Sequence, residues 1–202
     1  FDYYVSASGF AQDGFREHAR QDTRRAFANL GHQLTPQLET RVYLGHVDSV
    51  SALPGAITKA QLQDDPRAAN AGRVGGDQHR DIRWTRLSSK TVYRPDARQQ
   101  FELFVFASHK RLHHPIFQVF AQRNRDHGLE ARYTVESEIG GRRNRLVVGI
   151  APSRGTTHED RFVNVGGASG ARTNASRQVA RNLELYAGNQ HHLAPTLAFV
   201  AR

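Results

Sequence analysis

The sequence contains no cysteine, which excludes disulfide scaffolds, zinc sites built from thiolates and cysteine nucleophiles. It also contains no methionine, even at position 1, and both ends fall inside alternating patterns, so we expect a piece of a longer chain. Uninterrupted apolar runs are only a few residues long, whereas a membrane-spanning helix needs about 20 apolar residues. The sequence therefore predicts no transmembrane helix, but a membrane strand, whose signal is weaker, stays possible.

Acidic residues are in the minority. The chain has 19 Asp and Glu against 28 Lys and Arg, which gives a net charge of +9. Such a surplus attracts phosphate-rich partners, and it also suits any surface or lumen that must draw in anions. The basic residues are dispersed rather than clustered into a footprint, so we expect no nucleic-acid partner.

Alternation of apolar and polar residues, by contrast, recurs from end to end. In residues 99–110, for example, Phe101, Leu103 and Val105 fall on one side of a strand and Gln100 and Glu102 on the other. Many of the alternating segments exceed the usual strand length of globular domains and favour membrane strands over a sandwich. The pattern predicts about nine strands, at 1–9, 20–34, 38–48, 80–93, 98–110, 127–139, 144–156, 176–190 and 195–202.

The connections between these strands are of two kinds. Tight turns rich in Pro, Gly, Asp and Asn are expected at 35–37, 94–98, 140–144 and 191–195. Longer polar stretches lie at about 10–19, 49–79, 111–126 and 158–174. Because the two kinds alternate, the sequence predicts an all-β, antiparallel up-and-down meander with short turns at one end and long loops at the other. Inside 49–79, the capping-box spacing of Thr58 and Gln61 and the later Pro66 predict a short helix at about 58–65.

The two faces of each strand indicate where the membrane lies. Outer-membrane barrels have apolar residues outside and polar residues inside, short periplasmic turns, long extracellular loops and aromatic girdles. Tyr93 and Phe101, beside a tight turn, fall where a girdle would lie. In the strand 38–48, we expect lipid on the side of Leu38, Thr40, Val42 and Leu44, and a polar interior on the side of Glu39, Arg41 and Tyr43.

Whole segments of the sequence also carry a resemblance. The succession RRAFANLGHQLTPQLETRVYLGHVDS, LPGAITKAQLQDDPRAAN, HPIFQVFAQRNRDHGLEARY and RFVNVGGASGARTNASRQVARNLELYAGN resembles the barrel of a TonB-dependent outer-membrane receptor. It is most similar to the ferric-siderophore type, and the likeness spans essentially all 202 residues. The resemblance implies a barrel of about 22 strands filled by a plug, in the outer membrane of a Gram-negative bacterium.

The resemblance also sets the functional expectations. It implies uptake of a ferric siderophore or another anionic metal chelate, with energy from the inner-membrane TonB complex acting through a plug. We expect residues 1–202 to be a partial barrel domain without that plug. We further expect contact with outer-membrane lipid and lipopolysaccharide, no enzymatic activity, no cofactor and no metal site.

Basic residues on the loop side are the candidate ligand-binding groups, because ferric chelates are often anionic and arginine binds carboxylates in a bidentate manner. The alternative is that they contact lipopolysaccharide phosphates or only solvate loops. The candidates are Arg16, His18, Arg24, Arg83, His109, Lys110, Arg123 and Arg125.

Two rival functions are compatible with parts of the sequence. A soluble basic all-β module, such as a sandwich that binds nucleic acid, requires the outward residues to be buried against a second sheet. A small nucleotide-binding oxidoreductase could use the glycines at 166, 167 and 170, although their spacing is wrong for a phosphate-binding turn. That enzyme requires a helix at 175–187. The adjacent histidines at 113–114 and 191–192 point to opposite faces if they lie on strands, and are therefore poor chelators.

Overall fold

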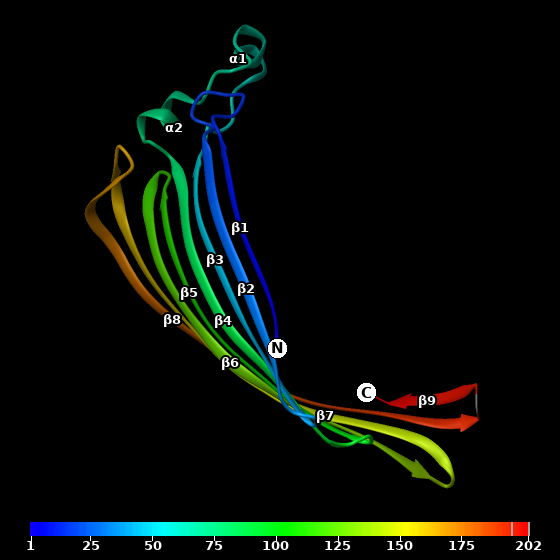
Figure 1. Ribbon diagram of the computed structural model, residues 1–202. Helices are drawn as coiled ribbons and strands as arrows, with labels where there is room; N and C mark the ends of the chain where they lie inside the picture. The colour runs from blue at the N-terminus through cyan, green and yellow to red at the C-terminus, as the bar shows by residue number, and fades with distance from the viewer. Residues whose placement is uncertain (195, 202) are drawn as a thin grey trace.

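The chain folds into one curved antiparallel sheet in which every strand pairs with its neighbours in sequence. The computed structural model describes residues 1–194 and 196–201, and the nine strands follow the order β1 to β9 without a crossover (Figure 1). The strands are β1 (Asp2–Gln12), β2 (Gln21–Thr35), β3 (Leu38–Ala52), β4 (His79–Asp96), β5 (Gln99–Pro115), β6 (Gln118–Ile139), β7 (Arg142–Val165), β8 (Ala168–Ala194) and β9 (Leu197–Ala201).

The predicted meander of nine strands is confirmed, with one correction to its loops. The tight turns at 36–37, 97–98 and 140–141 and the long connections at 13–20 and 53–78 lie where the sequence places them. The long loops expected at 111–126 and 158–174 are wrong, because β5 to β8 continue through both stretches and turn tightly at 116–117 and 166–167. In the predicted turn at 191–195, residues up to 194 belong to β8, and position 195 lies outside the described residues.

Two short helices occupy the connection between β3 and β4. Helix α1 (Lys59–Asp64) begins after Thr58, whose side chain accepts from the Gln61 backbone in the expected capping box. It ends just before Pro66, as the sequence predicts. Helix α2 (Ala71–Gly75), capped by Asn70, is not predicted by the sequence. Both helices lie beyond the loop ends of the strands (Figure 1). None of the helices among the described residues is long and apolar enough to span a membrane.

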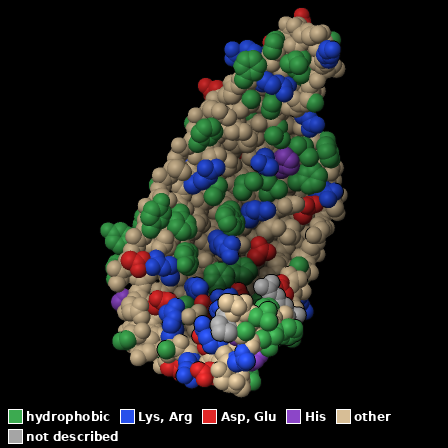
Figure 2. Space-filling view, turned by 90° about the vertical axis from the view of Figure 1, so that its right-hand side faces the viewer, with side chains coloured by type: hydrophobic (Ala, Val, Ile, Leu, Met, Phe, Trp, Pro, Cys, Tyr) green, Lys and Arg blue, Asp and Glu red, His purple; other side chains and the backbone are tan. Residues whose placement is uncertain are grey.

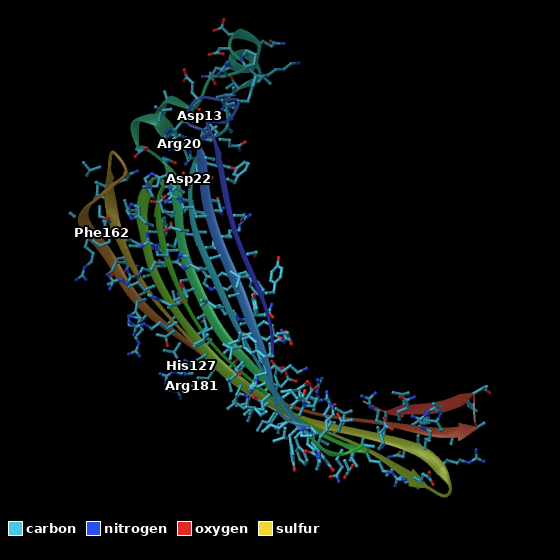
Figure 3. The ribbon with its side chains drawn as sticks, in the orientation of Figure 1. Asp13, Arg20, Asp22, His127, Phe162 and Arg181 are labelled. Carbon is cyan, nitrogen blue, oxygen red and sulfur yellow. The ribbon has the colours of Figure 1, made fainter. Side chains whose placement is uncertain are left out.

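The register assigns each strand residue to a face. Residues directly opposite each other in neighbouring strands share a face, so Val42, Ser89 and Val105 form one row and Tyr43, Ser88 and Phe106 form another. The first row belongs to the convex face, where His127 and Arg181 also lie (Figure 3). The expected division of β3 is thus confirmed, with Leu38, Thr40, Val42 and Leu44 on one face and Glu39, Arg41 and Tyr43 on the other.

The convex face is apolar along a belt near the tight turns. Its aromatic rings stack across strands, with centroid distances of 6.2 Å between Tyr93 and Phe101 and 4.5 Å between Phe101 and Tyr133. Leu103 is 45% exposed and Leu185 is 71% exposed. Among the described residues the buried apolar side chains are few, namely Val92, Pro115 and Val119, so the belt packs against no protein core.

These observations exclude both rival folds. A sandwich needs a second sheet against the apolar face, and the described residues form a single sheet. The nucleotide-binding enzyme needs a helix at 175–187 after a parallel strand, but this stretch belongs to strand β8 and pairs antiparallel with β7.

Candidate functional site

The concave face carries aromatic and basic side chains toward the loop end. Trp84 lies directly opposite Lys110, and Arg86 lies opposite Ser108. The guanidinium carbon of Arg86 is 5.1 Å from the centroid of the Phe106 ring. Figure 2 shows this face, on which hydrophobic and basic side chains are interspersed. We define the aromatic–basic band as Arg25, Phe27, Trp84, Arg86, Phe106 and Lys110, which the register places on adjacent rows of β2, β4 and β5.

The cations of this band are available for a ligand. Within residues 1–194 and 196–201, Arg25, Arg86 and Lys110 form no ion pair. Guanidinium groups bind planar carboxylates in a bidentate manner, and ring faces add stacking area. The band is therefore chemically suited to an anionic ligand with planar or aromatic groups.

A glycine on β6 permits the position of one ring in the band. Gly128 lies directly opposite Phe106. A Cβ atom at position 128 would lie 2.8 Å from Cε1 of Phe106 and 2.9 Å from the carbonyl oxygen of Pro152. Because both neighbours approach so closely, only glycine lets the Phe106 ring lie over the next strand.

Below the band, toward the tight turns, the concave face carries paired charges. Glu102 accepts hydrogen bonds from Arg132 and from Gln100 at 2.7 Å, and its carboxylate lies 3.3 Å from the ammonium of Lys90. Arg94 donates to Glu39 at 3.0 Å. These cations and anions pair with one another within the sheet. This ionic layer therefore contributes to the structure of the sheet and leaves few unpaired charges for a ligand.

At the loop end, side chains fasten the connections to one another. Arg16 donates to the carbonyl oxygens of Ala68 at 2.8 and 3.0 Å and of Gly55 at 2.8 Å. The Nε2 atom of His18 lies 2.8 Å from the carbonyl oxygen of Gln78. Asn164 donates to the carbonyl oxygens of Gly76 and Ile116 and accepts from the backbone of Gly167, and thereby joins three connections.

The eight residues predicted as ligand contacts fall into three places. Arg16 and His18 hold the loops together, and Lys110 belongs to the aromatic–basic band. The other five lie on the convex face, where register groups Arg24, Arg83 and Arg123 in one row and His109 and Arg125 in the next. The sequence reasoning missed Trp84, Arg86 and Phe106. The alternation of side chains along a strand could have found them. On β4 and β5, the even-numbered residues from 84 to 90 and from 104 to 110 lie on the same face as Lys110.

Two carboxyl groups at the loop end have shifted pKa values. Hydrogen bonds from Arg161 at 2.7 Å and from Gln122 at 2.5 Å lower the pKa of Glu159. Burial raises the pKa of Asp81, although the nearby His79 and His113 oppose the shift. One oxygen of Asp81 is buried without a hydrogen-bond partner among the described residues.

Histidines at the loop end contact the backbone. The Nε2 atom of His113 lies 3.0 Å from the carbonyl oxygen of Gly167, and Nδ1 of His114 lies 2.8 Å from that of His79. In the part of the chain that the structure describes, no three His, Asp or Glu side chains are arranged to hold a metal ion.

Comparison with known proteins identifies the fold. No protein-family model and no curated protein matches the sequence. Among solved structures, the unliganded ferric citrate transporter FecA is similar over 95% of this chain and 30% of its own, with a TM-score of 0.81 and 15% identity. FpvA of Pseudomonas aeruginosa with bound iron-loaded pyoverdine is similar over 98% of this chain and 32% of its own, with a TM-score of 0.81 and 12% identity.

A further structure of the ferripyoverdine receptor, from the outer membrane of Pseudomonas aeruginosa, has a TM-score of 0.70 over 98% of the chain at 14% identity. The chain therefore spans about a third of the length of the solved structures that it matches. The likeness that the sequence indicates is confirmed for the fold: the nine strands have the architecture of part of the β-barrel of TonB-dependent ferric-siderophore receptors.

Proposed function

We propose that this chain forms part of the wall of an outer-membrane receptor that takes up a ferric siderophore or another anionic metal chelate. The observation that supports this proposal is the two-faced sheet, whose convex face is apolar and exposed while its concave face carries unpaired cations among aromatic rings. An exposed apolar face of this extent is costly in water and favourable in lipid. The fold of ferric citrate and pyoverdine receptors adds independent support.

In this proposal the barrel lies in the outer membrane of a Gram-negative bacterium. The tight turns lie on the periplasmic side, and the connections at 13–20 and 53–78 lie outside the cell. The convex face contacts lipid and lipopolysaccharide, and residues 1–202 are a partial barrel domain. Uptake is driven by the inner-membrane TonB complex acting through a plug.

The aromatic–basic band is the proposed chelate contact of the wall. Of the residues predicted from the sequence, Lys110 is the one that lies in this band. We propose that Arg25, Arg86 and Lys110 attract the negative charge of the chelate, and that Trp84 and Phe106 stack on its planar groups. The ionic layer around Glu102 then forms the wall below the bound chelate.

Transport of iron-55 in cells tests the proposal. The full-length protein is expressed in a strain that lacks its own copy, with ferric citrate and ferripyoverdine as probes. Replacing Arg25, Arg86 and Lys110 by Gln should lower the affinity for the transported chelate at least about tenfold, which corresponds to roughly 1.4 kcal/mol. The control carries Gln at Arg98, in a tight turn, and at Arg142 and Arg143, the first two residues of β7 beside the next tight turn, and should transport normally. Equal losses in both triple variants would contradict the assignment of the band.

A further inference from the structure

Five titratable side chains meet where the 53–78 connection enters β4. We call them the histidine–aspartate cluster. They are His18 from the 13–20 connection, Asp77 from the 53–78 connection, His79 and Asp81 from β4, and His113 from β5. Nε2 of His18 lies 3.8 Å from Asp77, and the ring centroids of His79 and His113 are 5.6 Å apart. The side chains of His18 and His79 are only 16% and 17% exposed, so solvent screens their charges weakly.

The ring of His79 has one nitrogen in an unfavourable contact when the ring is neutral. Its Nδ1 lies 2.7 Å from the carbonyl oxygen of Asp77, which can only accept, so Nδ1 carries the hydrogen and Nε2 is an acceptor. This Nε2 faces one carboxylate oxygen of Asp81 at 3.6 Å. The other oxygen of Asp81 is buried without a partner among the described residues. A proton on Nε2 would replace this contact between two acceptors by a charge-assisted one.

The cluster connects the outer connections with the sheet. His18 donates to the carbonyl oxygen of Gln78 at 2.8 Å, and His113 donates to that of Gly167, in the β7–β8 turn, at 3.0 Å. A Cβ atom at Gly167 would lie 2.7 Å from Oδ2 of Asp77, so this carboxylate packs directly on the turn. A change of charge in the cluster therefore acts on both long connections and on the β7–β8 turn.

The backbone of both connections has an uncommon conformation at the cluster. Within residues 1–194 and 196–201, His18 and Asp77 are the two non-glycine residues with positive φ, at 52° and 40°. The left-handed region is unfavourable for most side chains, and residues stay there where surrounding contacts hold them. Weakening of those contacts would therefore allow both connections to relax.

Further charged and titratable groups face the cluster from neighbouring strands. They are Asp48 on β3, Arg83 on β4, Arg111 and His114 on β5, Arg123 on β6 and Asp160 on β7. Arg83 lies 2.7 Å from Asp48, and Arg172 lies 3.4 Å from Asp160. The carboxylates that remain for the ring of His79 are those of Asp77 and Asp81, each at 3.6 Å.

The carboxyl group of Asp81 responds to pH in the same direction as the histidine. Burial raises its pKa, although His79 and His113 oppose the shift. A carboxyl group with a raised pKa in the folded state stabilises it fully below the ordinary value of 3.8, and this stabilisation is lost as the pH rises through the raised pKa. Imidazole changes its charge between about pH 5 and 8, and a histidine beside carboxylates also stabilises the fold in its protonated form. Proton uptake therefore strengthens the cluster at both groups.

We propose that the histidine–aspartate cluster is a pH-sensitive latch, in which proton uptake by His79 fastens the 53–78 connection to β4 and proton loss releases it. This connection, with α1 and α2, lies beyond the loop ends of the strands and contacts the 13–20 connection through the bond from Glu17 to Arg67 (Figure 1). The aromatic–basic band lies toward the same end of the sheet. The latch goes beyond the proposed function, because it controls the mobility of a connection and not the contact with a chelate.

A spin label on α1 tests the latch in the purified full-length protein in detergent. The label is attached to Gln63→Cys, with any cysteine elsewhere in the full-length protein replaced by serine. From about pH 5.5 to about pH 8, the ratio of mobile to immobile label should rise about tenfold, because a proton that binds tenfold more tightly to the fastened form changes the equilibrium by that factor. His79→Gln should give a constant ratio, since an amide does not titrate in this range.

A second variant and a matched control complete the experiment. Asp81→Asn preserves the shape of the side chain but removes its charge, so it should abolish most of the rise, and it covers the case in which His79→Gln does not fold. The control is His158→Gln, which removes an exposed histidine of β7 outside the cluster and should keep the full rise.

A constant ratio in the wild type would overturn the latch, as would a rise that survives both His79→Gln and Asp81→Asn, or an equal loss of the rise in His158→Gln. Uptake of iron-55 chelates is measured on the same proteins. If the rise is present but no chelate is transported, the proposed function fails while the latch stands. If transport is normal and the ratio is constant, only the latch fails.

Discussion

Glu102 illustrates how single residues hold the concave face together. Its side chain is 11% exposed and is contacted by Arg132, Lys90 and Gln100. Replacing it by Ala leaves these donors without their acceptor, so we expect a loss of about 1–3 kcal/mol in the free energy of unfolding. Urea unfolding of the refolded full-length protein in detergent measures this loss.

The matched control for Glu102 is an exposed ion pair. Glu136 lies 3.6 Å from Arg143, and both side chains are open to solvent. Glu136→Ala should change the free energy of unfolding by no more than about 0.5 kcal/mol, because exposed pairs contribute little. Similar losses at both positions would show that burial does not decide the strength of these pairs.

The lowered pKa of Glu159 predicts how the free energy of unfolding depends on pH. Arg161 and Gln122 lower its pKa below the ordinary value of 4.5. A carboxyl group with a lowered pKa in the folded state stabilises the protein above its unfolded pKa, and this stabilisation is lost as the pH falls through the folded pKa. When the pH falls below 4.5, the ordinary pKa of a glutamate, the Glu159→Gln protein should therefore lose less free energy of unfolding than the wild type. The free energy of unfolding of the wild type and of Glu159→Gln, measured across this pH range, tests the prediction. If both proteins show the same dependence on pH, Glu159 does not contribute in this way.

Residue parity explains why the site was only partly predicted. A shift by one position moves a side chain to the other face of a strand, so Arg24 and Arg25 lie on opposite sides of the wall. The sequence identified basic residues near the loop end without using this parity. It therefore combined Lys110, on the concave face, with Arg83 and Arg123, on the convex face.

At the scale of elements, Asn164 links the β7–β8 end to the connection that contains α1 and α2. It donates at 2.8 Å to Gly76 and at 2.7 Å to Ile116. Asn164→Ala should free the 53–78 connection, because both carbonyl groups lose their donor. Limited proteolysis of the full-length protein should then cleave this connection several-fold faster. Asn182→Ala is the control, since Asn182 makes only a long contact of 3.5 Å with Ser153, and its cleavage pattern should match the wild type.

The lengths of the strands could not be predicted fully from the alternation of apolar and polar residues. Alternation locates strands where one face is apolar, and it located all nine. Beyond the apolar belt both faces become polar, as in residues 122–127, so the alternation disappears while the backbone pairing continues. The wrong loops at 111–126 and 158–174 follow from that loss of signal, whereas the helix at α1 was predictable because its capping box is local.

For the whole molecule, the division between the two faces makes a direct prediction about lipid contact. Val105 lies in the apolar belt of the convex face, and Asn182 lies one row away on the concave face. Val105→Arg should lower the stability of the membrane-inserted protein by about 2–4 kcal/mol, the cost of arginine on a lipid-facing strand position near the midplane. Asn182→Arg should be tolerated, because the concave face is the water-facing side in the proposed barrel. Unfolding of the full-length protein in lipid vesicles compares them, and a greater loss for Asn182→Arg would reverse the assignment of the faces.

Orientation across the membrane is the remaining property of the whole molecule, and it decides which compartment meets the aromatic–basic band. The chain has no native cysteine, so single cysteines can report it. Gln63 on α1 and Ala97 in the β4–β5 turn are both exposed and lie at opposite ends of the sheet. In intact cells, a membrane-impermeant maleimide should label Gln63→Cys and spare Ala97→Cys, because only the long connections face outward in the proposed orientation. Permeabilised cells should show labelling at both positions. Labelling of Ala97→Cys alone in intact cells would show that the barrel has the opposite orientation. The aromatic–basic band would then lie at the periplasmic end, away from a chelate that arrives from outside the cell.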